Sequence, residues 1–167
     1  MEDFGSITIN EMLQRREAAE LEVSRLIGKL VFSYSRFVTG LHYCVAWMNL
    51  GRDLDTYGSI AEDLVAATLI KKIERHAAGY FGEGSKRHKK FAAWTERAHA
   101  LREKRNIVMH ASWSIEAYGR HAIAVSTPVF VDPPRVITFS ADDLLELSNA
   151  CDRLTSELYH LRRAHPF

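Results

Sequence analysis

The sequence predicts an all-α protein: a four-helix bundle in one domain, with a short β-hairpin inserted between the third and fourth helices. Two observations predict it. Apolar residues recur at alternating spacings of three and four over several long segments, and one stretch at about 121–139 is instead β-branched, aromatic and rich in proline. The 167 residues, 47% of them hydrophobic, are enough to bury a core. This excludes disordered chains and small disulfide-stapled scaffolds, and we expect one helical domain over residues 1–167.

The first predicted helix carries a continuous apolar seam. Its members are Val23, Ile27, Leu30, Tyr34, Phe37, Leu41, Cys44 and Met48. Asn10 is a suitable N-cap for an early start, and Gly51 is a natural stop. We expect a turn over residues 52–59.

Two more helices are predicted in the middle of the chain. The second follows Ile60, Leu64, Ala67, Ile70, Ile73 and Ala77, and it ends before a loop that contains Gly79, Gly82 and Gly84. The third runs from about Arg87 to Ala111, with Phe91, Trp94, Ala98, Leu101 and Val108 on one side.

The β-hairpin and the last helix complete the predicted fold. Residues 122–139 favour two strands joined at Asp132-Pro133-Pro134. Ser140 and Asp143 have the spacing of a helix cap. An uninterrupted seam follows, made of Leu144, Leu147, Cys151, Leu154, Leu158 and Leu161.

The third helix contains the most informative residues for function. Arg105 continues its apolar stripe, where a core residue is expected. A charged guanidinium on a buried stripe is costly unless an anionic or strongly polar group meets it, so Arg105 marks a candidate site. Asn106 and His110 are four positions apart and share a helix face.

The segment Arg105-Asn106-Ile107-Val108-Met109-His110 resembles the Arg-x4-His motif of HEPN domains, and its place near the end of the third helix of a bundle is similar to theirs. The resemblance implies a metal-independent endoribonuclease with no cofactor, of the kind used in toxin–antitoxin or phage-defence systems. It also implies a homodimer whose active site combines two copies of the motif. An antitoxin or other regulatory partner fits such a role. In some HEPN toxins a tyrosine two residues after the histidine is modified by the antitoxin, but here that position is Ser112.

The residue types suit this chemistry. His110 can take the proton from a ribose 2′-hydroxyl, Arg105 can bind phosphate oxygens in the transition state, and Asn106 can orient either group. The products would be a 2′,3′-cyclic phosphate and a 5′-hydroxyl. Residues five apart differ by about 140° around a helix, so Arg105 and His110 do not share a face. Either the arginine side chain curls around, or the helix is distorted, or a second subunit completes the pair.

Basic residues in two stretches of the chain are candidates for RNA binding. Lys86, Arg87, Lys89 and Lys90 follow the glycine-rich loop, and Arg102 and Lys104 precede the motif. A solvated helix surface is the alternative for each of them. Trp94 and Trp113 could stack on bases, but their spacing is more typical of core residues.

Composition sets further bounds. A formal net charge of +1 neither demands nor excludes a polyanionic partner, so any RNA site must be local. The acidic N-terminus, and the lack of an apolar run of about 18 residues, predict a cytoplasmic protein without a membrane partner. Cys44 and Cys151 are expected to be buried free thiols, and the histidine spacing predicts no metal site. The rival function is a non-catalytic helical module for dimerisation or interaction.

Overall fold

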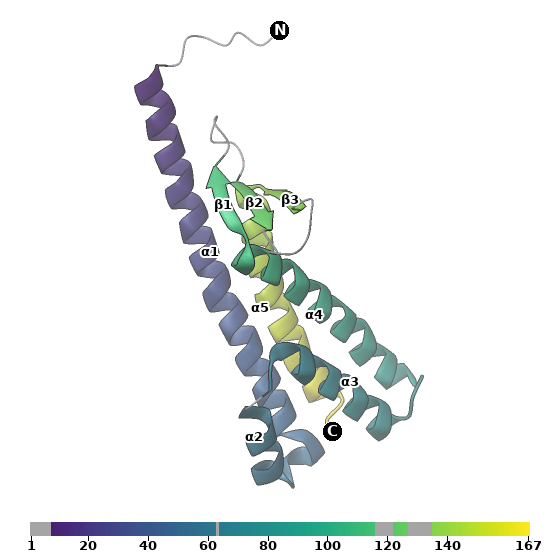
Figure 1. Cartoon of the computed structure of the whole chain (residues 1–167). Helices are drawn as coiled ribbons and strands as arrows, with labels where there is room; N and C mark the ends of the chain where they lie inside the picture. The colour runs from purple at the N-terminus through teal and green to yellow at the C-terminus, as the bar shows by residue number, and fades with distance from the viewer. Residues whose placement is uncertain (1–7, 63, 116–121, 127–134) are drawn as a thin grey trace. The chain divides into compact units, whose positions relative to one another are not determined.

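The structure is a computed structural model that describes residues 8–62, 64–115, 122–126 and 135–167, and the described part is mostly helical (Figure 1). Its α-helices are α1 (Ile9–Ala46), α2 (Leu54–Glu62), α3 (Ala66–Phe81), α4 (Lys86–His110) and α5 (Ala141–Ala164). A 3-10 helix, η1, covers Met48–Gly51. The strands are β1 (Ser112–Ile115), β2 (Ala122–Ser126) and β3 (Arg135–Phe139).

Packing within the chain defines two compact units. The sheet unit comprises residues 1–30 and 105–147, and the helical unit comprises residues 31–104 and 148–167. Among the described residues, no helix is both long enough and apolar enough to cross a bilayer.

The start of α1 differs from the prediction. Asn10 lies inside the helix, and Thr8 caps it instead. The Thr8 hydroxyl accepts a hydrogen bond from the Glu11 N–H at 3.3 Å, while the Glu11 carboxylate accepts one from the Thr8 N–H at 2.9 Å. This reciprocal pair is a capping box. The prediction missed it because it placed the start of the helix at Asn10, after Thr8.

The core of the helical unit is built on the predicted seams. Trp94 is fully buried, lies 6.2 Å from Phe37 between ring centroids, and donates from Nε1 to the Leu154 carbonyl at 3.0 Å. Cys44 and Cys151 are buried free thiols, as predicted. Burial raises the pKa of the Cys44 thiol to about 12, so it stays protonated at neutral pH.

The predicted turn at residues 52–59 is wrong, because most of it is helix α2. The change of direction comes earlier, where Asn49 and Leu50 adopt left-handed backbone angles with φ of 55° and 58°. Gly51 follows with φ of 72°, and a Cβ atom there would lie 2.8 Å from the Trp47 ring. The Asn49 side chain donates to the Asp53 carboxylate at 2.9 Å, which joins this corner to the start of α2.

The predicted second helix is likewise two helices. α2 ends at Glu62, and α3 begins at Ala66 after Val65, which has extended backbone angles of φ −74° and ψ 155°. The described residues therefore form five α-helices where the sequence predicted four. α4 begins and ends within one residue of its predicted bounds, and α5 begins directly after the predicted cap residue Ser140.

The sheet unit holds three antiparallel strands in the order β1-β2-β3 (Figure 1). β2 and β3 pair in the predicted hairpin region, with Ala124 opposite Ile137. The predicted turn at Asp132-Pro133-Pro134 lies outside the described residues. β1 was not predicted and pairs with β2, placing Trp113 opposite Ala124. α5 then begins with the predicted cap, in which the Ser140 hydroxyl accepts from the Asp143 N–H at 3.0 Å.

Candidate active site

Helix α4 presents the candidate site at its C-terminal end. Its seam is buried at Phe91, Trp94, Ala98, Leu101 and Val108. Arg105 lies on the same face, four residues after Leu101 and three before Val108, and it is half-buried. The structure therefore keeps the feature that the sequence indicated: a permanently charged group at a position that otherwise belongs to the core.

Arg105 and Asn106 are in direct contact. The Arg105 guanidinium donates a hydrogen bond from Nη1 to Oδ1 of Asn106 at 3.2 Å, and both side chains are half-buried. A hydrogen bond from a charged donor is stronger than one between neutral groups. The Asn106 amide thus helps to orient the guanidinium, rather than only the histidine that shares its helix face.

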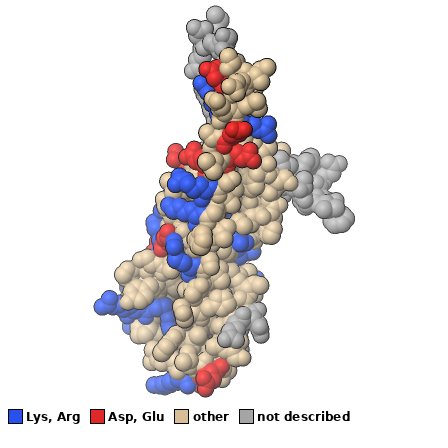
Figure 2. Space-filling view, turned by 90° about the vertical axis from the view of Figure 1, so that its left-hand side faces the viewer, with Lys and Arg blue, Asp and Glu red and all other residues tan. Residues whose placement is uncertain are grey.

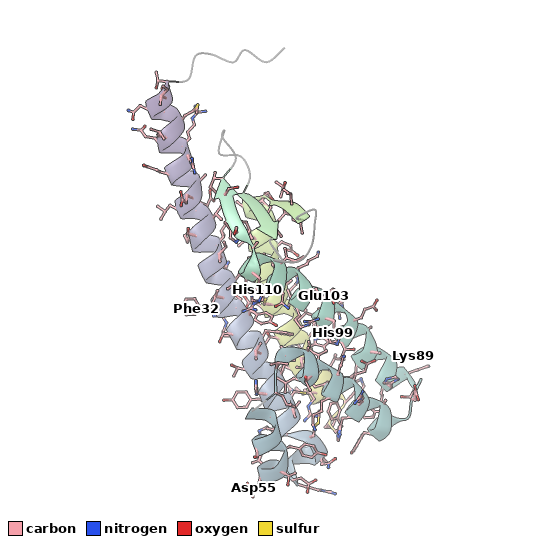
Figure 3. The ribbon with its side chains drawn as sticks, viewed as in Figure 1. Phe32, Asp55, Lys89, His99, Glu103 and His110 are labelled. Carbon is pink, nitrogen blue, oxygen red and sulfur yellow. The ribbon has the colours of Figure 1, made fainter. Side chains whose placement is uncertain are left out.

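His110 is the last residue of α4 and is exposed (Figure 3). Its ring is therefore accessible from solvent. α4 stays α-helical up to His110, so helix distortion does not bring the ring towards Arg105. On a regular helix five positions correspond to about 140° and about 7.5 Å of rise. A curled arginine side chain and a second copy of the motif remain as the ways to join the two groups.

The residues after His110 form a structural support. The Trp113 indole donates from Nε1 to the Val108 carbonyl at 2.9 Å, which satisfies a carbonyl in the last turn of α4. Its ring centroid lies 5.6 Å from that of Phe139. Trp113 therefore ties the end of α4 to the sheet, and Trp94 belongs to the core. Ser112 is exposed at the start of β1.

The basic residues at the start of α4 are at the opposite end of the helix from His110, as the labels of Lys89 and His110 show (Figure 3). Lys86, Arg87, Lys89 and Lys90 are all exposed. Arg87 lies over the Phe81 ring, 5.8 Å from its centroid. A helix start carries a partial positive charge, which adds to the charge of these four side chains at that end.

Arg102 and Lys104 precede the motif on the same helix. Arg102 is half-buried and forms an ion pair with Glu103 at 3.5 Å, whereas Lys104 is exposed. Burial lowers the pKa of His99, and the nearby Arg102 guanidinium lowers it further. On the face of the molecule shown in Figure 2, acidic and basic side chains are interspersed, in keeping with the net charge of +1.

A groove in the helical unit gathers charged side chains that the sequence did not bring together. It has a volume of about 470 Å³ and lies between α4 and the C-terminal part of the chain. Its lining consists of Lys90, Ala93, Arg97, Glu157, His160, Leu161, Ala164 and His165. Arg97 and Glu157 form an ion pair at 2.7 Å, and Lys90 Nζ lies 3.1 Å from His165 Nε2. Burial, Lys90 and Arg87 all lower the pKa of His165, which leaves the neutral ring able to accept a hydrogen bond from Lys90.

Within the described ranges, no three His, Cys, Asp or Glu side chains lie close enough together to hold a metal ion. Comparisons with protein-family models, curated proteins and solved structures give no match to this chain.

Proposed function

We propose that this chain is an HEPN-like four-helix-bundle protein and a metal-independent endoribonuclease that leaves 2′,3′-cyclic phosphate and 5′-hydroxyl ends. The observation that supports the proposal most strongly is the half-buried Arg105, held by Asn106, five residues before an exposed His110 at the end of α4. A biological role as a toxin or phage-defence effector agrees with this chemistry.

In the proposed reaction, His110 removes the proton from a ribose 2′-hydroxyl. The 2′-oxygen then attacks the adjacent phosphorus, a new O–P bond forms, and the bond to the 5′-oxygen breaks. That oxygen gains a proton and leaves as a 5′-hydroxyl. Histidine suits the first step because its ordinary pKa lies near neutrality.

Arg105 would bind the non-bridging phosphate oxygens, whose negative charge increases in the transition state. Guanidinium can meet two of these oxygens at once, and its contact with Asn106 limits its motion before RNA arrives. Because one helix separates Arg105 and His110 by about 140°, we propose that two copies of the motif form each site across a homodimer.

The experiment compares the wild-type protein with His110→Ala and Arg105→Ala on mixed RNA in the presence of a chelator. We expect wild type alone to produce cyclic-phosphate ends. His42→Ala is the matched control, since His42 lies in α1 of the helical unit, outside the motif, and this variant should cleave like wild type. Intact RNA at high concentration of a folded, dimeric wild-type protein would favour the non-catalytic interaction module instead.

RNA binding is tested separately from cleavage. Replacing Lys86 and Lys89 by Glu should weaken RNA binding and reduce its dependence on salt, because fewer counterions are released from the phosphates. Both residues are exposed, so the fold should be preserved. Unchanged binding would assign these lysines to a solvated helix surface and leave Arg87, Lys90, Arg102 and Lys104 as the remaining predicted contacts.

A further inference from the structure

The first turns of α1 stand apart from the rest of the described sheet unit. Figure 1 shows them extending beyond the strands. From Ile9 to Glu22 every side chain is exposed except Ala19, which is half-buried. Ile9 is 78% exposed and Leu13 is 53% exposed. Yet the Thr8 capping box specifies this helix start with three hydrogen bonds.

A helix segment of this length is marginal in water when it packs against nothing. The described residues supply no cover for Ile9 and Leu13, so the segment presents an apolar surface that a partner can bury. The sequence of the segment indicates which partner fits.

One face of this segment has the spacing of a coiled coil. Residues at alternating intervals of four and three form what we call the N-terminal seam: Ile9, Leu13, Arg16, Glu20, Val23 and Ile27. Its two middle positions carry opposite charges, and both are exposed. Val23 and Ile27 at its end are half-buried.

The two charges select a direction of pairing. If two copies of the seam lay parallel, Arg16 would face Arg16 and Glu20 would face Glu20, which is unfavourable at seam positions. If they lie antiparallel about the level of residue 18, each Arg16 meets the partner's Glu20. The same register places each Leu13 against the partner's Val23 and each Ile9 near the partner's Ile27. In this register the opposite charges pair with each other and the apolar residues pair with apolar residues.

We propose that the N-terminal segment of α1 forms an antiparallel helix pair with the same segment of a second copy of this chain. The partner is a second copy of this chain because the N-terminal seam is complementary to itself. Its one basic and one acidic position lie symmetrically about residue 18. The inference rests on the proposed function in one respect: the α1 pairing is the contact that holds the homodimer in which two copies of the motif form each site.

The experiment measures the mass of the full chain in solution by sedimentation. Wild type should have twice the monomer mass of 19.0 kDa. Arg16→Glu gives two acidic seam positions and Glu20→Arg gives two basic ones, so each variant alone should sediment as a monomer. An equimolar mixture of the two should recover the dimer mass, because every seam charge then meets its opposite. Arg15→Glu is the matched control, since Arg15 lies outside the seam, and it should remain dimeric.

Cross-linking tests the direction. With Cys44 and Cys151 buried, a mixture of Leu13→Cys and Val23→Cys proteins should form a disulfide-linked dimer under mild oxidation, at a higher yield than either variant alone. A monomeric wild type, single variants that stay dimeric, or a mixture that stays monomeric would each overturn the proposal. A cross-link yield that is greater for Leu13→Cys alone than for the mixture would overturn the antiparallel direction. RNA cleavage is measured independently, so loss of the dimer proposal and loss of the nuclease proposal are distinguishable.

Discussion

Arg105 donates a hydrogen bond from Nη1 to Oδ1 of Asn106, its neighbour in the chain, at 3.2 Å. This contact makes Asn106 a positioning residue for the guanidinium. Replacing Asn106 by Ala should lower single-turnover RNA cleavage about 10-fold, because Arg105 keeps its charge but loses one restraint. Replacing Arg105 by Ala should cost about 10²–10³-fold, as for other transition-state donors.

The double variant provides the control for this prediction. If Asn106 acts through Arg105, then Asn106→Ala should have little further effect once Arg105 is already Ala. If instead the fold-losses of the two single variants multiply in the double variant, Asn106 acts independently of Arg105 and contacts the RNA itself.

Trp94→Phe should destabilise the helical unit. The change removes the hydrogen bond from the indole to the Leu154 carbonyl, now 3.0 Å long, which costs about 0.5–1.5 kcal/mol. It also removes ring volume from the core, which adds to the loss. Chemical denaturation monitored by circular dichroism measures the effect. Trp47→Phe is the matched control, since Trp47 is 53% exposed, and we expect a change within about 0.5 kcal/mol.

Gly51→Ala should destabilise the protein, while Gly79→Ala should stabilise it. Gly51 has φ of 72°, and an added Cβ would lie 2.8 Å from the Trp47 ring, so a loss of more than about 1 kcal/mol is expected. Gly79 lies inside α3, and a Cβ there meets no atom within 4 Å. Alanine is the better helix former by about 1 kcal/mol. The two melting temperatures should therefore move in opposite directions, and a shift of both in the same direction would contradict this account.

Stability should decrease in mild acid partly because of His76. Burial, Arg162 and Lys72 lower the pKa of this ring in the folded protein, so the unfolded chain binds a proton more readily. A lowered pKa stabilises the fold above the unfolded value of about 6.5, and this contribution is lost as the pH falls through the folded value. Melting temperatures at pH 8 and pH 5 measure it.

His76→Phe is the test variant for that pH dependence. The ring of His76 already lies 5.0 Å from Phe167 between centroids, among aromatic neighbours that can accept a phenyl group. We expect a smaller loss of melting temperature in acid than for wild type, with the remainder due in part to His99 and His165, whose pKa values are also lowered. An unchanged loss would show that His76 makes no such contribution.

The sequence predicted the parts of the fold that depend on helical periodicity. The seams of α4 and α5 keep the three-four spacing throughout. α4 begins and ends within one residue of its prediction, and α5 begins at the predicted cap. It failed between Met48 and Val65, since the left-handed angles of Asn49 and Leu50 leave no periodic signal. β1 was missed because four residues are too few to show alternation.

The same distinction applies to the candidate site. The half-burial of Arg105 followed from its place in the α4 seam, so local spacing was sufficient. The groove beside Lys90 was not predictable, because Lys90 and His165 are 75 positions apart and only tertiary packing brings them together. How Arg105 and His110 would come together was likewise not predictable, because one regular helix places them about 140° apart.

The corner at Asn49, Leu50 and Gly51 gives a way to recognise distant relatives of this chain. A leucine at φ of 58° is held in a backbone state that glycine or asparagine adopts at lower cost. As related sequences diverge, Leu50 should therefore be replaced by glycine or asparagine. Gly51 should stay unchanged wherever Trp47 is present, because the indole packs against position 51. A short Asn/Gly signature after the first helix should outlast overall sequence identity.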